Sequence, residues 1–103
     1  MAPVNRLPPI HPGEILREEY LAPLGMSANA LARELHVPPN RITAILQKKR
    51  SVTADTALRL ARFFGTTAQV WLNLQASYDL KITEQSTGPM IEAQVRPREQ
   101  HAA

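Results

Sequence analysis

The chain of 103 residues contains no cysteine, and this absence excludes several kinds of chemistry at once. Without cysteine there is no disulfide framework, no thiolate nucleophile and no cysteine-based zinc site. No apolar run approaches the roughly 18 residues that a transmembrane helix needs, and no signal-peptide pattern precedes the first predicted helix. We therefore expect a cytoplasmic protein that does not associate with a membrane.

Sequence patterns typical of enzymes are also missing. The three histidines, His11, His36 and His101, lie far apart, and none has a carboxylate at the spacing of the HExxH zinc motif. The chain has neither a glycine-rich phosphate loop nor a nucleophile elbow. We therefore predict a protein that is not an enzyme and that needs no cofactor or metal ion.

Positive charge is modest in total but unevenly distributed. The net charge is +3 over the whole chain. Between residues 40 and 62, six basic side chains stand against one acid, Asp55, which leaves a local charge of +5. Such a concentration is typical of a surface that binds phosphate groups, although basic surfaces also occur for solubility alone.

Two short amphipathic helices joined by a tight turn are predicted between Ser27 and Lys49. The first helix has its apolar residues on one side, at Ala28, Leu31, Ala32 and Leu35. The second has a narrow apolar stripe of Ile42, Ile45 and Leu46, and Pro39 suits its first position. This is the pattern of a helix-turn-helix. The alternative is an ordinary helical hairpin with a solvated polar face.

The outward face of the second helix carries side chains suited to the major groove of DNA. Asparagine fits adenine, arginine fits guanine, and alanine or the threonine methyl fits the thymine methyl. We expect base edges to be contacted by Asn40, Arg41 and Thr43. Ala44 should lie near a thymine methyl, and Gln47 lies on the same side of the helix. The predicted phosphate contacts are Ser27, Lys48, Lys49 and Arg50.

The predicted fold is an all-α domain of five helices over residues 12–82, preceded by an extended, proline-rich arm over residues 1–11. We expect the first helix to begin at Pro12 and to end at Pro23, before Gly25. Residues 83–103 are rich in Gln, Pro, Gly and charge and are predicted to be a flexible tail. Within it, residues 90–95 can form a short strand whose partner would belong to a second subunit.

The fifth predicted helix, from about Thr67 to about Lys81, is apolar on two sides. Trp71 belongs to its main apolar side, whereas Leu72 and Leu80 point roughly the other way. A small domain leaves such a second side exposed unless another surface covers it. We therefore predict a homodimer with Trp71, Leu72, Leu80 and Ile91 in its interface.

The sequence strongly resembles the HigA-type antitoxins, which belong to the Xre-like helix-turn-helix group. The resemblance covers about Pro9 to Leu80, in the runs PIHPGEILREEYLAPLGMSANALARELHVPPNRITAIL and SVTADTALRLARFFGTTAQVWLNLQASYDL. Its most specific motifs are HPGEIL, TADTALRLA and WLNLQ. His36 and Lys48 stand where the family commonly has glycine.

The resemblance implies a homodimeric repressor of its own toxin–antitoxin operon, which also neutralises a RelE-like (HigB-like) ribonuclease toxin. Such a dimer would bind a palindromic operator whose half-site centres lie about 34 Å apart. The alternative is a helix-turn-helix regulator without a protein client.

A surface that is free of both DNA and the dimer partner is needed for the toxin. We expect this surface on the arm and on the outer face of the first helix, at Pro8, Glu14, Glu18 and Leu21. A ribonuclease that holds RNA must be basic, so clustered carboxylates offer complementary charge. Exposed glutamates on a helix can equally be only a solvated face.

Overall fold

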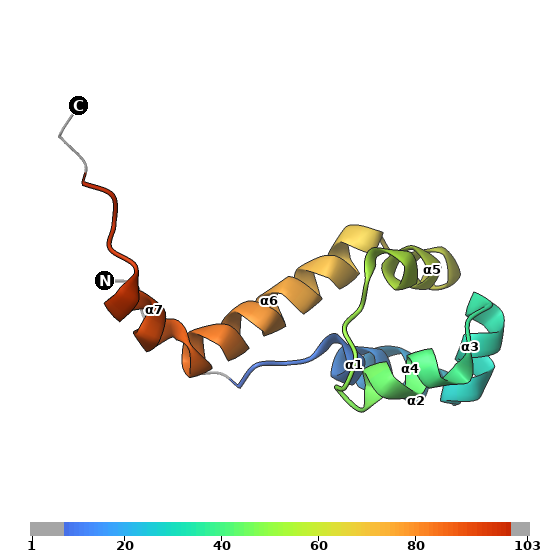
Figure 1. Cartoon of the computed structure of the whole chain (residues 1–103). Coiled ribbons are helices and arrows are strands. Elements are labelled where there is room, and N and C mark those ends of the chain that lie inside the picture. Colours follow the sequence, from blue (N-terminus) through green and yellow to red (C-terminus); the bar gives the residue numbers. More distant parts are fainter. Residues whose placement is uncertain (1–7, 100–103) are drawn as a thin grey trace.

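The computed structural model describes residues 8–99, and all regular secondary structure in this range is helical. In chain order the elements are α1 (Pro12–Ile15), the π-helical η1 (Leu16–Leu21), α2 (Ala22–Leu24), α3 (Ala28–Leu35), α4 (Pro39–Leu46), α5 (Ala54–Phe64), α6 (Ala68–Ser86) and α7 (Gly88–Gln94). Helices α1–α5 gather at one end of the molecule, and α6 and α7 lead away from them (Figure 1). The predicted all-α fold is confirmed, with α7 added to the five expected helices. Residues 1–7 and 100–103 of the predicted arm and tail lie outside the described range.

The first helical segment is continuous from α1 to α2, but its middle is a π-helix. The N–H of Ala22 donates to the carbonyl of Arg17, five residues back. The next residue, Pro23, has no N–H, and in an α-helix its ring would clash with a carbonyl four residues earlier. The wider turn accommodates this proline, so the prediction that Pro23 ends the helix is wrong. The segment continues through Leu24 and ends at Gly25, where φ is 60°.

The π-helical turn also changes the direction in which Leu21 points. In an α-helix, Leu21 would lie about 140° around the axis from Leu16. In a π-helix the repeat is closer to five residues, so the two leucines share one side. Leu21 is 5% exposed and Leu16 is fully buried. The prediction that Leu21 lies on the outer face of this helix is therefore wrong.

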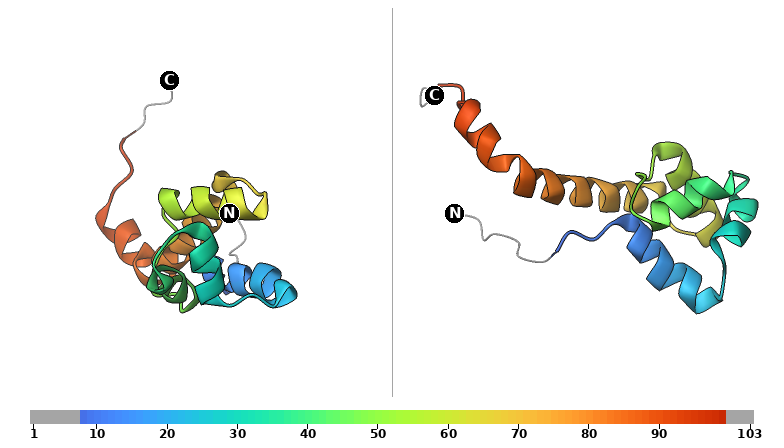
Figure 2. Two further views of the ribbon diagram at one scale, coloured as in Figure 1. Left: turned by 90° about the vertical axis from the view of Figure 1, so that its right-hand side faces the viewer. Right: turned by 60° about the horizontal axis from the view of Figure 1, so that its bottom comes forward.

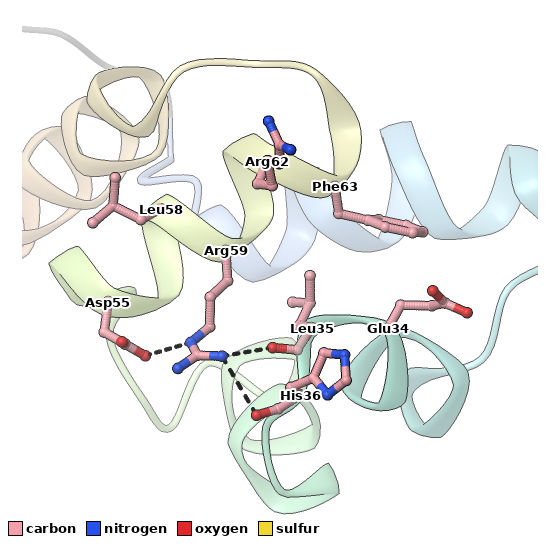
Figure 3. A pocket seen from close by; sticks show the side chains of 8 residues that line it. All are labelled: Glu34, Leu35, His36, Asp55, Leu58, Arg59, Arg62 and Phe63. Carbon is pink, nitrogen blue, oxygen red and sulfur yellow. Dashed lines mark hydrogen bonds and ion pairs between the residues drawn. The ribbon is translucent and has the colours of Figure 1, made fainter.

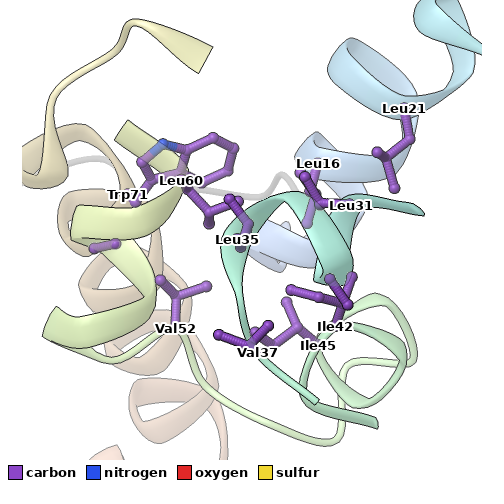
Figure 4. Close-up of a cluster of buried hydrophobic side chains, with 12 residues drawn as sticks. Leu16, Leu21, Leu31, Leu35, Val37, Ile42, Ile45, Val52, Leu60 and Trp71 are labelled. Atoms are coloured by element: carbon purple, nitrogen blue, oxygen red, sulfur yellow. The ribbon is translucent and has the colours of Figure 1, made fainter. Parts of the chain in front are cut away.

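One hydrophobic core joins η1, α3, α4 and α5 to the first half of α6 (Figure 4). Trp71 is almost fully buried in this core, and its indole N–H donates to the hydroxyl of Thr66 at 2.9 Å. The ring of Tyr20 lies 5.2 Å from that of Trp71 and 4.7 Å from that of Phe64, which fixes η1 against α5 and α6. Because Trp71 is used inside the protomer, its predicted place in a dimer interface is wrong.

Residues 90–95, predicted to be able to form a strand, lie almost entirely within α7. Residues 8–99 contain no strand with which they could pair, whereas a helix satisfies its own backbone groups. Pro89 lies in the first turn of α7, where a missing N–H costs little. The strand prediction is therefore wrong. α6 also continues to Ser86, across the predicted domain boundary after residue 82.

The C-terminal half of α6 and α7 extend away from the bundle (Figure 2). The described molecule is correspondingly elongated, with extents of 56 × 27 × 22 Å. Exposed apolar side chains follow this extension, at Leu80, Ile82, Met90, Ile91 and Val95. None of the helices within residues 8–99 is long and apolar enough to cross a membrane.

Candidate DNA-binding surface

The turn between α3 and α4 closes in the way that a helix-turn-helix requires. The hydroxyl of Ser27 accepts from the N–H of Ala30 at 3.1 Å and so caps the start of α3. At its other end, His36 takes a left-handed conformation with φ of 58°, and the N–H of Val37 donates to the carbonyl of Ala32. This is a Schellman motif with histidine in place of the usual glycine.

α4 presents its polar side chains outward, as the sequence predicts. Ile42 and Ile45 are fully buried beneath it, whereas the predicted DNA-facing residues are exposed (Asn40 and Gln47) or half-buried (Arg41, Thr43 and Ala44). The Thr43 hydroxyl donates to the carbonyl of Pro39 at 3.0 Å. Its only proton is thereby used within the helix, which leaves the oxygen lone pairs and the methyl group for DNA.

The C-terminal end of α4 is held by the first helical segment. The guanidinium of Arg17 donates to the carbonyl of Leu46 at 2.7 Å, where a cation suits the helix dipole. The backbone of Gly13 packs directly on the carbonyl of Ile45. Lys48 adopts a left-handed conformation with φ of 64°, and its ammonium lies 3.5 Å from a carboxylate oxygen of Glu14.

The basic loop after α4 is anchored at its far end to α6. Its side chains Lys48, Lys49 and Arg50 are all exposed. The N–H of Val52 donates to the side-chain oxygen of the buried Gln75 at 2.8 Å, and the amide of Gln75 donates in turn to Asp79. The loop that carries these cations therefore starts and ends at fixed points.

A network of three charged residues, not predicted from the sequence, connects α4, α5 and the turn. One carboxylate oxygen of Asp55 accepts from Arg41 at 2.5 Å and from Arg59 at 2.9 Å. Arg59 also donates to the carbonyls of Leu35 and His36, at 2.8 and 3.4 Å (Figure 3). Hydrogen bonds from Arg59 and then Arg41 hold the pKa of the Asp55 carboxyl below its ordinary value.

Two features of the sequence point to this network. Asp55 is the lone acid in the basic stretch, and Arg59 follows it at the i+4 spacing of a helical ion pair. The partner in α4, by contrast, is 14 residues away in sequence.

The residues predicted for the toxin are only partly brought together. Pro8 and Glu18 are exposed, Glu14 is half-buried, and Leu21 is in the core. These residues are predicted to lie on a surface free of DNA, but Glu14 pairs with Lys48, which follows α4 and belongs to the predicted DNA-binding surface. Of the predicted dimer residues, Leu80 and Ile91 are 61% and 45% exposed, whereas Leu72 is half-buried against the core.

Comparison with known proteins places this architecture in a family. The family model described as "Helix-turn-helix" matches residues 16–71. Virulence-associated protein I of Dichelobacter nodosus is 64% identical over 81 residues, which cover 79% of this chain and 75% of that protein.

Two solved structures are similar over almost their whole length. An addiction module antidote protein of the HigA family from Coxiella burnetii is 58% identical, with a TM-score of 0.84 over 88% of this chain and 99% of that one. The Pseudomonas aeruginosa antitoxin HigA, solved with the higBA promoter, is 44% identical, with a TM-score of 0.85 over 88% of this chain and 99% of that one. The chain belongs to the HigA family of helix-turn-helix antitoxins.

Proposed function

We propose that this protein is a sequence-specific DNA-binding antitoxin, which represses its own toxin–antitoxin operon and neutralises a RelE-like ribonuclease toxin. The observation that carries the proposal is the outward face of α4, where amide, guanidinium and hydroxyl groups lie above two fully buried isoleucines and beside a basic loop. Operator and promoter complexes of similar proteins support the DNA-binding part of the proposal. Such a repressor acts in the cytoplasm, where the operon lies.

The base contacts are assigned by the chemistry of each side chain on the outward face of α4. Asn40 is suited to adenine, Arg41 to guanine, and Ala44 to a thymine methyl. Thr43 accepts a hydrogen bond or offers its methyl group, since its proton is bonded within α4. Gln47 lies on the same side at the end of the helix.

Phosphate contacts flank this face. The Ser27 oxygen accepts the capping bond from Ala30, so its own proton is available to a phosphate oxygen. Lys49 and Arg50 are exposed, and the ammonium of Lys48, 3.5 Å from Glu14, has three N–H donors and can also reach a phosphate. These contacts position the protein on DNA without reading its sequence.

A homodimer would place two α4 helices in successive major grooves, about 34 Å apart. The extension formed by the end of α6 and α7 supplies a surface for it, through the exposed side chains of Leu80 and Ile91. An isologous contact, in which both copies use the same patch, fits a palindromic operator.

The toxin site is proposed on the arm and on the exposed edge of η1, at Pro8 and Glu18. Glu18 lies in η1, and the neighbouring Glu19 is also exposed. Two carboxylates there attract a basic ribonuclease. Glu14 has a second role, because its carboxylate pairs with Lys48 beside the DNA-binding surface.

DNA binding is tested by titrating labelled DNA from upstream of the gene at several salt concentrations. Arg41→Ala should cost about 1–3 kcal/mol per half-site and relax the preference for one sequence. Lys49→Ala should weaken all sequences alike and flatten the salt dependence. Arg98→Ala, which removes a charge from the exposed segment after α7, is the control. Unchanged affinity and preference in Arg41→Ala would contradict the assignment of α4 to the groove.

Toxin binding is tested by co-purification with the product of the neighbouring reading frame, followed by calorimetry. Glu18→Lys and a chain lacking residues 1–10 should each bind the toxin more weakly and still bind DNA. Glu99→Lys, in the exposed segment after α7, is the matched charge-reversal control. A neighbouring product that does not bind at all would favour the alternative, a regulator without a protein client.

A further inference from the structure

Asp55 lies in the first turn of α5, next to a surface that is otherwise basic. It is the only acid between residues 40 and 62, and its side chain is 56% exposed. A carboxylate at this place repels phosphate and so lowers the affinity for DNA of any sequence. We therefore expect the contacts of Asp55 to favour DNA binding in a way that offsets this repulsion.

Those contacts run from α4, the proposed recognition helix, to the turn between α3 and α4. Asp55 accepts from Arg41 and Arg59 with the same oxygen, at 2.5 and 2.9 Å. Arg59 is fixed in turn by the backbone carbonyl of Leu35, at 2.8 Å (Figure 3). Charge-assisted bonds of this kind are strong and directional. The Arg41 guanidinium is thus tied, through two side chains, to the backbone at the end of α3.

We propose that Asp55 is a specificity-determining residue, which holds the Arg41 guanidinium in the orientation in which it reads a base. This inference rests on the proposed DNA-binding function. The bond to Asp55 takes one of the five N–H donors of Arg41, so enough donors remain for a bidentate contact with guanine. An arginine that is already oriented loses less side-chain entropy when it binds.

The proposal predicts opposite effects on two affinities. Loss of the Asp55 charge removes a repulsion that acts on every DNA sequence, so binding to random DNA should tighten. Loss of the oriented guanidinium weakens only the contact with the correct base, so operator binding should not share this gain. The ratio of operator affinity to random-DNA affinity should therefore fall.

The experiment measures dissociation constants for operator and scrambled duplexes at one salt concentration. Asp55→Asn should lower the affinity ratio by about tenfold, the scale of one good bidentate base contact, and should bind the scrambled duplex more tightly than the native protein does. Asp55→Glu, which keeps the charge, should restore part of the ratio. Thermal unfolding of each variant checks that the fold is retained.

Two controls separate orientation from charge alone. Glu34→Gln removes one negative charge from an exposed position on α3 and should change both affinities by the same factor. In a chain that already carries Arg41→Ala, adding Asp55→Asn should lower the ratio no further, because both changes remove the same contact.

Three outcomes would count against the proposal. Equal changes of both affinities in Asp55→Asn would show that Asp55 acts only through its charge. This result would overturn the inference and leave the proposed DNA-binding function intact. A further fall in the ratio of operator to scrambled-DNA affinity, when Asp55→Asn is added to Arg41→Ala, would have the same consequence. If the native protein does not distinguish operator from scrambled DNA, the proposed function fails and the inference fails with it.

Discussion

Gly13 lies so close to Ile45 that the contact leaves no room for a side chain. A Cβ atom on residue 13 would lie 2.0 Å from the carbonyl oxygen of Ile45 and 2.8 Å from its carbonyl carbon. Neither backbone atom can move without displacing α4. The glycine of the HPGEIL motif is therefore required where α1 meets the recognition helix.

Gly13→Ala should lower the free energy of unfolding by about 2–3 kcal/mol, because the added methyl group must push α1 and α4 apart. Urea denaturation measures this change. Gly88→Ala is the control, since its new Cβ would lie 3.9 Å from the Cβ of Glu84, an ordinary contact. Similar stability of the two variants would contradict the close approach of α1 to α4.

His36→Gly should raise the free energy of unfolding by about 1 kcal/mol. His36 has φ of 58°, a conformation that costs roughly 1–2 kcal/mol for a residue with a Cβ atom, and its side chain is exposed. His36→Ala keeps the Cβ atom and should show no gain. A stability of His36→Gly at or below that of His36→Ala would rule out strain at this turn.

Stability should fall as the pH is lowered through the range in which histidine titrates. The Nδ1 atom of His11 accepts from the N–H of Gly13 at 2.9 Å, so this nitrogen carries no proton. Burial, assisted by the charge of Lys48, lowers the pKa of His11 below its ordinary value of 6.5, against opposing effects of Asp79 and of the Arg50 backbone.

The unfolded chain therefore binds a proton at His11 before the folded chain does. The contribution of neutral His11 is fully present above the unfolded pKa of about 6.5 and is lost as the pH falls toward the lower, folded pKa. Urea denaturation between about pH 7 and pH 5 should show this slope. His11→Asn keeps a capping oxygen without titrating and should flatten the slope. If the free energy of unfolding changes equally with pH in both proteins, groups other than His11 cause the change.

Leu80→Asp combined with Ile91→Asp should convert the proposed dimer into a monomer at micromolar concentration. Both side chains are exposed on the extension, so the change should not disturb the core of the protomer. Sedimentation equilibrium measures the mass. Leu58→Asp, at a 63% exposed position on α5, is the control and should remain dimeric. If the double variant is still a dimer, the extension is not part of the interface.

The sequence predicted the helix-turn-helix in detail because the relevant signals are local. Ser27 and Pro39 mark helix starts, Gly25 marks a helix end, and all three act at these places in the structure. The polar and apolar faces of α3 and α4 also follow from their helical period.

The predictions that are wrong depend on helix geometry or on packing that a local sequence pattern does not reveal. Leu21 was placed outside because the prediction assumed 3.6 residues per turn, whereas η1 is a π-helix. Trp71 was placed in the interface because periodicity shows that a side chain is apolar and cannot show which surface covers it. Residues 90–95 alternate in polarity like a strand, yet residues 90–94 are helical.

The helical class, the position of α4 and the side chains on its outer face follow from the sequence, because they depend on neighbours within about one or two turns. The contacts that hold α4 in place come from packing between helices. Arg17 caps it from 29 residues away, and Asp55 orients Arg41 from 14 residues away. Such contacts depend on how η1 and α5 pack around α4, and no spacing along the chain encodes the distance between side chains on different helices.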